Sequence, residues 1–71
     1  MEGRYSNQLR VGYNGYEFVF EFAQSGSGEQ PWVHTRIITA PAYAKAFLEV
    51  IQESLAEYEA AFGPIVVNER Q

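Results

Sequence analysis

The stretch Tyr5–Phe22, YSNQLRVGYNGYEFVFEF, decides the fold of this chain. Large apolar side chains recur at every second position on both sides of Asn14-Gly15, which is the pattern of two strands that each bury one face. Asn-Gly is the strongest short-range signal for a type I′ hairpin, because both central residues of that turn take positive φ. The stretch therefore predicts an antiparallel β-hairpin with a two-residue turn.

A two-residue turn also fixes which residues of the two strands lie opposite each other. The expected pairs are Tyr13 with Tyr16, Val11 with Phe18, Leu9 with Phe20, and Asn7 with Phe22. The large apolar side chains then share one face, while Arg10 on the reverse face lies beside Val19 and diagonal to Glu17 and Glu21. The same turn predicts that Gly15→Val strains the backbone and costs about 1–3 kcal/mol.

A third strand is expected at residues 32–39, which are rich in β-branched and aromatic side chains. The polar residues 24–31, QSGSGEQP, have no periodicity and indicate a long hairpin loop before it. Two sets of residues of this strand compete for the inward face. We expect Val33, Thr35 and Ile37 to point inward, because that choice buries no charge.

Residues 41–63 predict one long helix with its own start and stop signals. Pro41 suits its first turn, with Thr39 or Ala40 as the cap, and Gly63-Pro64 ends it. Its apolar face is wide and consists of residues at spacings of three and four, flanked by Phe47, Val50, Ser54 and Ala61: Ala44, Leu48, Ile51, Leu55, Tyr58 and Phe62. We expect this helix to lie across the apolar face of the sheet.

The helix is longer than the sheet that it is expected to cover. At 1.5 Å per residue it extends about 33 Å, whereas a strand of eight residues spans about 27 Å. Tyr58 and Phe62 then overhang the sheet and need another neighbour. The segment Ile65–Val67 beyond the helix is expected to form a short fourth strand or an arm on a partner, and residues 66–71 to fray.

These elements predict a single α+β domain over residues 1–71, a three-stranded antiparallel β-meander followed by one long helix (βββα). A domain of this size buries only about 60% of the surface that its unfolded chain exposes. Small domains usually add disulfides, a metal or a partner, and here there is no cysteine and a single histidine. Self-association remains, and we expect a homodimer or larger symmetric oligomer with Leu55, Tyr58 and Phe62 in the contact.

The charge balance bears on the class of partner. The nine acidic residues, all Glu, against five Lys and Arg give a net charge of −4, which disfavours binding to nucleic acid or to anionic membranes. The N-terminus lacks an apolar signal region, and no stretch reaches the length of a membrane span. Together with the absence of cysteine, this predicts a soluble cytoplasmic protein without membrane contact.

No group of residues indicates catalysis, a metal or a cofactor. His34 has neither a Cys nor an Asp with which to form a catalytic group. Glu49, Glu53 and Glu57 have the spacing of a solvated acidic helix face. Glu17 and Glu21 would lie about 13 Å apart along a strand, too far for paired glycosidase carboxylates.

Two function classes remain in contention, with an enzyme third. The preferred hypothesis is a noncatalytic, homo-oligomeric protein-interaction module, in which Trp32, His34 and Arg36 are candidate contacts for a partner protein. The alternative is a small regulator that binds single-stranded nucleic acid by stacking bases on the aromatic sheet. Such a platform needs nearby cations, and the strands supply only Arg4, Arg10 and Arg36.

The chain also resembles a known family along residues 4–65. The matching pattern comprises Arg4-Tyr5-Ser6-Asn7, Glu17-Phe18-Val19-Phe20-Glu21-Phe22, Thr35-Arg36-Ile37-Ile38, Pro41, Ala44-Lys45, Leu48, Gln52-Glu53, and Tyr58-Glu59-Ala60-Ala61-Phe62-Gly63-Pro64-Ile65. It is similar to that of a family of small bacterial proteins classed as a domain of unknown function. Glu21 stands where that family tends to have Asp, and Ala40 where it often has a Ser or Thr cap. The resemblance implies the order of strands and helix and no activity.

Overall fold

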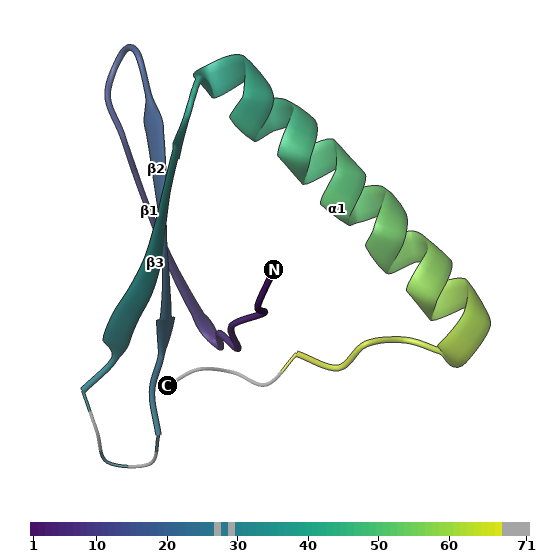
Figure 1. The fold of residues 1–71 in the computed structure, drawn as a ribbon. Helices are drawn as coiled ribbons and strands as arrows, with labels where there is room; N and C mark the ends of the chain where they lie inside the picture. Colours follow the sequence, from purple (N-terminus) through teal and green to yellow (C-terminus); the bar gives the residue numbers. More distant parts are fainter. Residues whose placement is uncertain (27, 29, 68–71) are drawn as a thin grey trace.

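The computed structural model describes residues 1–26, 28 and 30–67. Three strands and one helix follow one another along the chain (Figure 1): β1 (Gln8–Tyr13), β2 (Phe18–Gln24), β3 (Trp32–Thr39) and α1 (Pro41–Phe62). β2 lies in the centre of the sheet and is antiparallel to both neighbours. The predicted βββα order and α+β class are confirmed.

The register predicted for the first hairpin is wrong by two residues. Tyr13 pairs with Phe18, Val11 with Phe20 and Leu9 with Phe22, so the connecting loop has four residues and not two. The side chain of Asn14 explains the longer loop. Its Oδ1 accepts hydrogen bonds from the backbone N–H groups of Tyr16 at 2.7 Å and Glu17 at 2.9 Å, and its own N–H donates to the Glu17 carbonyl at 3.0 Å.

Gly15 consequently does not have the conformation that a type I′ turn requires. The glycines with positive φ in the described residues are Gly28 and Gly63. A Cβ at Gly15 would meet no heavy atom within 4 Å. The strong destabilisation expected for Gly15→Val therefore loses its basis.

The facial pattern of the hairpin is nevertheless the predicted one. A shift by two residues leaves each side chain on the same side of the sheet, because the side-chain period of a strand is two. One face, here called the apolar face, carries residues from all three strands: Leu9, Val11, Tyr13, Phe18, Phe20, Phe22, Thr35 and Ile37. The other, the charged face, carries Arg10, Glu21 and Arg36.

A bulge in the pairing of β2 and β3 changes the face of one predicted inward residue. Phe22 pairs with Thr35, but the next residue, Ala23, pairs with Val33. The extra residue is His34, and such an insertion reverses the alternation beyond it. Thr35 and Ile37 thus lie on the apolar face as predicted, whereas Val33 lies on the opposite one with Ala23.

The ends of α1 are those expected from the sequence. Ala40 is the N-cap and makes no side-chain cap hydrogen bond, and Pro41 begins the helix. At the other end Gly63 takes a φ of 100°, and its N–H donates to the Glu59 carbonyl at 2.9 Å. The Glu59 carboxylate then accepts the N–H of Ile65 at 2.9 Å, which turns the chain away from the helix axis.

The segment after the helix forms no strand within the described residues. Ile65–Val67 has neither regular structure nor a place in the sheet, so the fourth strand that was considered for it is absent there. Of the tail predicted to fray, residues 68–71 lie outside the described residues.

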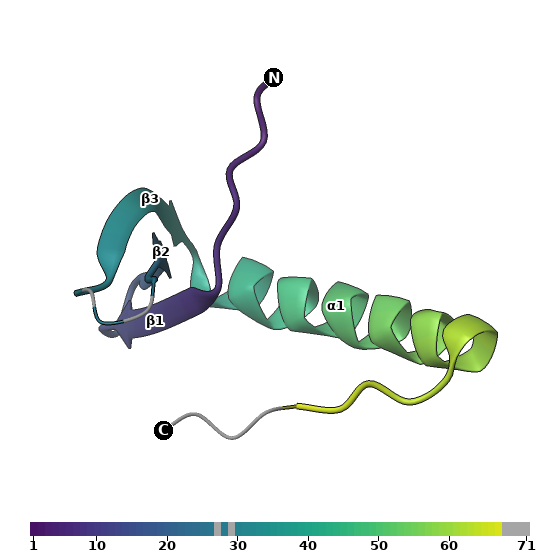
Figure 2. The same cartoon turned by 90° about the horizontal axis from the view of Figure 1, so that it is seen from below.

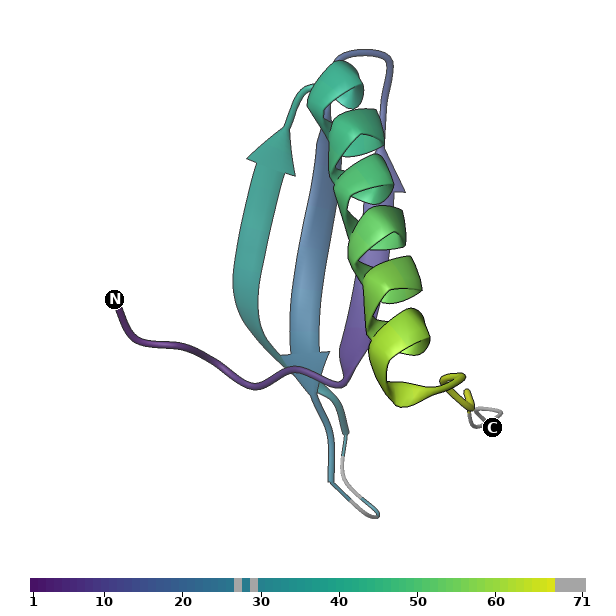
Figure 3. The same ribbon diagram turned by 90° about the vertical axis from the view of Figure 1, so that its right-hand side faces the viewer.

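The helix does not lie across the sheet, and here the prediction is wrong. α1 starts beside the end of β3 and diverges from the apolar face along its length (Figure 1), so that from below it points away from the sheet (Figure 2). Viewed from the side of the helix, it stands in front of the apolar face (Figure 3). The extensive contacts between elements are those within the sheet, and no residue of α1 is buried.

Candidate self-association surface

An apolar groove opens between the apolar face of the sheet and the first half of α1. Its volume is about 530 Å³. The sheet contributes Leu9, Val11, Phe18 and Phe20. The helix contributes Pro41, Ala44, Lys45, Phe47, Leu48 and Ile51. Lys45 is the one charged residue of this lining, so the groove favours an apolar occupant.

The side chains that line the groove are accessible to solvent in a single copy. Val11 is 48% exposed, Leu48 53% and Ile51 54%. Burying a side chain of this kind completely contributes about 1.5–3 kcal/mol. The groove is therefore an unused source of stability in the isolated chain.

The three residues predicted for the oligomer contact continue this surface toward the end of the helix. Leu55 is 46% exposed, Tyr58 51% and Phe62 76%. Their spacing of three and four residues places them on one side of α1, and the rings of Tyr58 and Phe62 touch with centroids 4.9 Å apart. Tyr58 and Phe62 are exposed, but they do not overhang a covered sheet as predicted, because α1 as a whole lies away from the sheet.

Trp32 and His34, two of the three candidate partner contacts, lie together at one end of the sheet. Their ring centroids are 5.7 Å apart. His34 Nε2 lies 2.9 Å from the Tyr5 carbonyl, and Nδ1 lies 2.7 Å from the Thr35 hydroxyl. Because a carbonyl only accepts, Nε2 donates the hydrogen bond to Tyr5. The structure thus gives His34 a tethering role, holding the N-terminal segment to β3.

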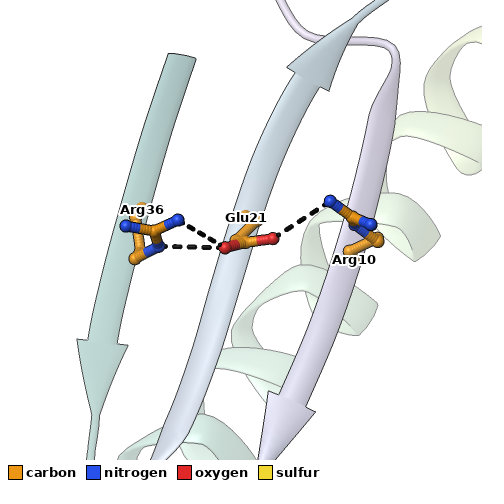
Figure 4. A network of polar contacts seen from close by, with 3 residues as sticks. All are labelled: Arg10, Glu21 and Arg36. Atoms are coloured by element: carbon orange, nitrogen blue, oxygen red, sulfur yellow. Dashed lines mark hydrogen bonds and ion pairs between the residues drawn. The ribbon is translucent and has the colours of Figure 1, made fainter. Parts of the chain in front are cut away.

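Arg36, the third candidate, lies on the charged face and apart from the other two. Its Nε and Nη2 donate to Glu21 Oε2 at 2.9 Å and 2.8 Å, and Arg10 approaches Glu21 Oε1 at 3.4 Å from the other neighbouring strand (Figure 4). Arg10 pairs directly with Glu21, and not with Val19 as expected. The three candidates therefore do not form a single site.

The groove was not predicted from the sequence, because the helix was expected to cover the sheet. The signal that would have pointed to it is the connection between β3 and α1, which is Ala40 alone.

Within the described residues no cluster of His, Asp or Glu suits a metal ion. None of the helices there has the length and hydropathy of a membrane span.

A family model described as "Protein of unknown function (DUF3467)" matches residues 1–67. The chain belongs to this family. The match includes all three strands and α1, so membership of a family of unknown function, as the sequence resemblance implied, is confirmed. No curated protein and no solved structure gives a significant match. The DUF3467 description assigns no activity, so a function has to be argued from the surfaces described above.

Proposed function

We propose that this chain is a noncatalytic, homo-oligomeric protein-interaction module that self-associates through its apolar face and α1. One observation carries the proposal: a single copy has almost no core. Ala23, at 6% exposure, is the one buried hydrophobic residue among those described, while the lining of the groove is open. A second copy is the simplest source of the missing contacts.

The size of the exposed surface supports the same proposal. The chain exposes 6384 Å², whereas a folded monomer of 8.1 kDa exposes about 4,500 Å². Its radius of gyration is 14.4 Å, against about 11 Å for a compact domain of this length. The extended N-terminal residues account for part of the excess and the open apolar surfaces for the rest.

The distribution of charge also favours association through these surfaces. At 100° per residue, Glu49, Glu53 and Glu57 fall on the side of α1 opposite Leu48 and Ile51 of the groove. The ion pairs of Glu21 lie on the charged face. Contact through the groove leaves these groups in water. Assembly then avoids the cost of desolvating a carboxylate.

The nucleic-acid alternative receives less support from this arrangement. Arg10 and Arg36 are held by Glu21 on the charged face, on the opposite side of the sheet from the rings of Phe18 and Phe20. Stacking platforms need cations beside their aromatic rings, and the lining of the groove supplies Lys45 alone. Protein association is therefore the function that we propose.

Light scattering after size-exclusion chromatography tests self-association directly. At tens of micromolar we expect the mass of a dimer or a larger symmetric oligomer, with a melting temperature that rises with protein concentration. A monomeric mass together with a cooperative, concentration-independent melt would overturn the proposal.

A pair of adjacent substitutions tests the role of the helix. Leu55→Asp places a charge on the apolar side of α1, and we expect it to shift the mass toward the monomer. Ala56→Asp adds the same charge one residue further on, on the polar side, and serves as the matched control. Equal effects of the two variants would show that this side of α1 is not the contact.

A further inference from the structure

We infer that α1 of each copy occupies the groove of the other, so that the module is a two-fold dimer with exchanged helices. This inference rests on the proposed self-association and specifies its geometry. Sheet and helix diverge within one chain (Figure 1). The groove between them is lined by Val11 and Phe20 on one wall and by Leu48 and Ile51 on the other.

The connection between β3 and α1 opposes closure of the groove by the chain's own helix. Ala40 is the only residue between the two elements, with φ −75° and ψ 153°. Pro41 follows it, and a proline disfavours the helical region for the residue before it. The Ala40 carbonyl accepts the N–H groups of Tyr43 and Ala44 at 3.1 Å and 3.0 Å, which fixes the first turn. The chain's own helix therefore does not fill the groove, which leaves the groove open to α1 of a second copy.

The shape of α1 fits a groove with two diverging walls. At 100° per residue, its uncharged side spans about 160°, from Val50 on one edge to Leu48 on the other. A helix that covers a single sheet needs an apolar arc of about 100°. The greater width of α1 allows it to contact the sheet and the helix of a partner at once, with Glu53 still in water.

The area available agrees with mutual insertion. The surface that one copy exposes beyond that of a compact monomer is roughly 1,900 Å², of which the apolar surfaces of the sheet and the helix form one part and the extended terminal segments another. Obligate dimers bury about 2,000–5,000 Å² in total, or about half of this per copy. A two-fold dimer in which both helices insert fills both grooves at once and leaves no apolar groove open for a third copy.

Complementation between two variants distinguishes an exchanged dimer from one in which each helix packs on its own sheet. Val11→Asp places a charge on the sheet wall, and Ile51→Asp places one on the helix. In an exchanged dimer the mixed species places both added charges at one contact between a sheet and a partner helix, and leaves the other contact of this kind without an added charge. We expect each variant alone to lose the dimer mass, and the two chains, refolded together, to regain it.

Adjacent residues provide the controls. Gly12→Asp lies next to Val11 but on the other face, where a Cβ meets no atom within 4 Å. Gln52→Asp lies next to Ile51 on the polar side of α1. Both should keep the dimer mass. Loss of the dimer in these controls would mean that added charge alone disrupts it, which would overturn the assignment of the groove.

A measurement on the unsubstituted chain keeps the inference testable if the variants fail to fold. In a dimer of one isotope-labelled and one unlabelled copy, filtered NOE spectra should show contacts between the Ile51 methyl groups of one chain and the Phe20 ring of the other. A dimer in which these contacts occur only within a chain would overturn helix exchange and leave the proposed function standing. A monomer would overturn both.

Discussion

The side-chain oxygen of Asn14 accepts the backbone N–H of Glu17 at 2.9 Å, and this contact sets the register of the sheet. With the bond to Tyr16 at 2.7 Å, it closes a loop of four residues in place of the two-residue turn. Val11 consequently faces Phe20. The side chain of a single loop residue thus decides which aromatic ring lies opposite each apolar residue of β1.

Asn14→Ala should destabilise the fold because it removes both hydrogen bonds of this loop. We expect a loss of about 1–2 kcal/mol in the free energy of unfolding, at about 0.5–1.5 kcal/mol for each bond. Gly15→Ala is the matched control and should change stability by less than about 0.5 kcal/mol, since the position has open space and no positive φ. Urea denaturation at one fixed protein concentration measures both. A larger loss of stability in Gly15→Ala than in Asn14→Ala would indicate that Gly15 takes positive φ in a type I′ turn.

The faces of the first hairpin were predictable from the sequence, whereas its register was not. Alternation of apolar side chains survives any even shift in pairing, so Leu9 and Phe20 share a face in either register. The register depended on whether Asn14 supplied positive φ or a side-chain acceptor, and both roles are common for Asn in turns. The bulge at His34 is a similar case, because nothing in residues 32–39 marks where an extra residue enters.

The bounds of α1 could be predicted from nearby residues, whereas its position relative to the sheet could not. Pro41 and Gly63 act within one turn of the chain, so its bounds followed from the sequence. The position of α1 relative to the sheet depends instead on the backbone angles of Ala40 and on what fills the groove. The residues expected at the contact, Leu55, Tyr58 and Phe62, were placed on one exposed side because periodicity alone determines that side.

Glu21→Gln should weaken the sheet slightly and in a salt-dependent way. It removes the carboxylate between Arg36 at 2.8 Å and Arg10 at 3.4 Å, and both arginines are largely exposed. Exposed ion pairs contribute about 0.2–1 kcal/mol each, so we expect a loss of about 1 kcal/mol or less that diminishes at high salt. Denaturation of Glu17→Gln, which breaks no ion pair among the described residues, gives the baseline. A loss that is independent of salt would argue against an electrostatic origin.

His34→Phe should release the N-terminal segment. The substitution keeps a ring beside Trp32 but removes the hydrogen bond from Nε2 to the Tyr5 carbonyl at 2.9 Å. We expect trypsin to cleave after Arg4 several-fold faster, as followed by mass spectrometry, because cleavage requires a locally unfolded segment. Thr35→Val removes only the partner of Nδ1 and should have a smaller effect. An unchanged rate in His34→Phe would show that other contacts hold this segment.

Binding of single-stranded DNA or RNA near physiological salt should be undetectable. The net charge is −4, and few cations are available to release counterions from phosphate. Trp32 is 63% exposed and is the single tryptophan of the chain, so a base that stacks on it would quench its emission. The bulge places Trp32 on the side of the sheet opposite Arg36, so the two arginines that Glu21 holds do not lie beside it.

The test is a titration with a mixed-sequence oligonucleotide at low salt, where binding to phosphate is strongest, with filter binding in parallel. We expect neither saturable quenching nor retention on the filter. Filter binding covers the case in which a partner copy shields Trp32 and makes its emission insensitive to bases. Saturable binding at micromolar concentration that is lost in Arg36→Ala would contradict the prediction. Such binding would require Arg36 to exchange its contact with Glu21 for a contact with phosphate. It would favour the nucleic-acid function over self-association alone.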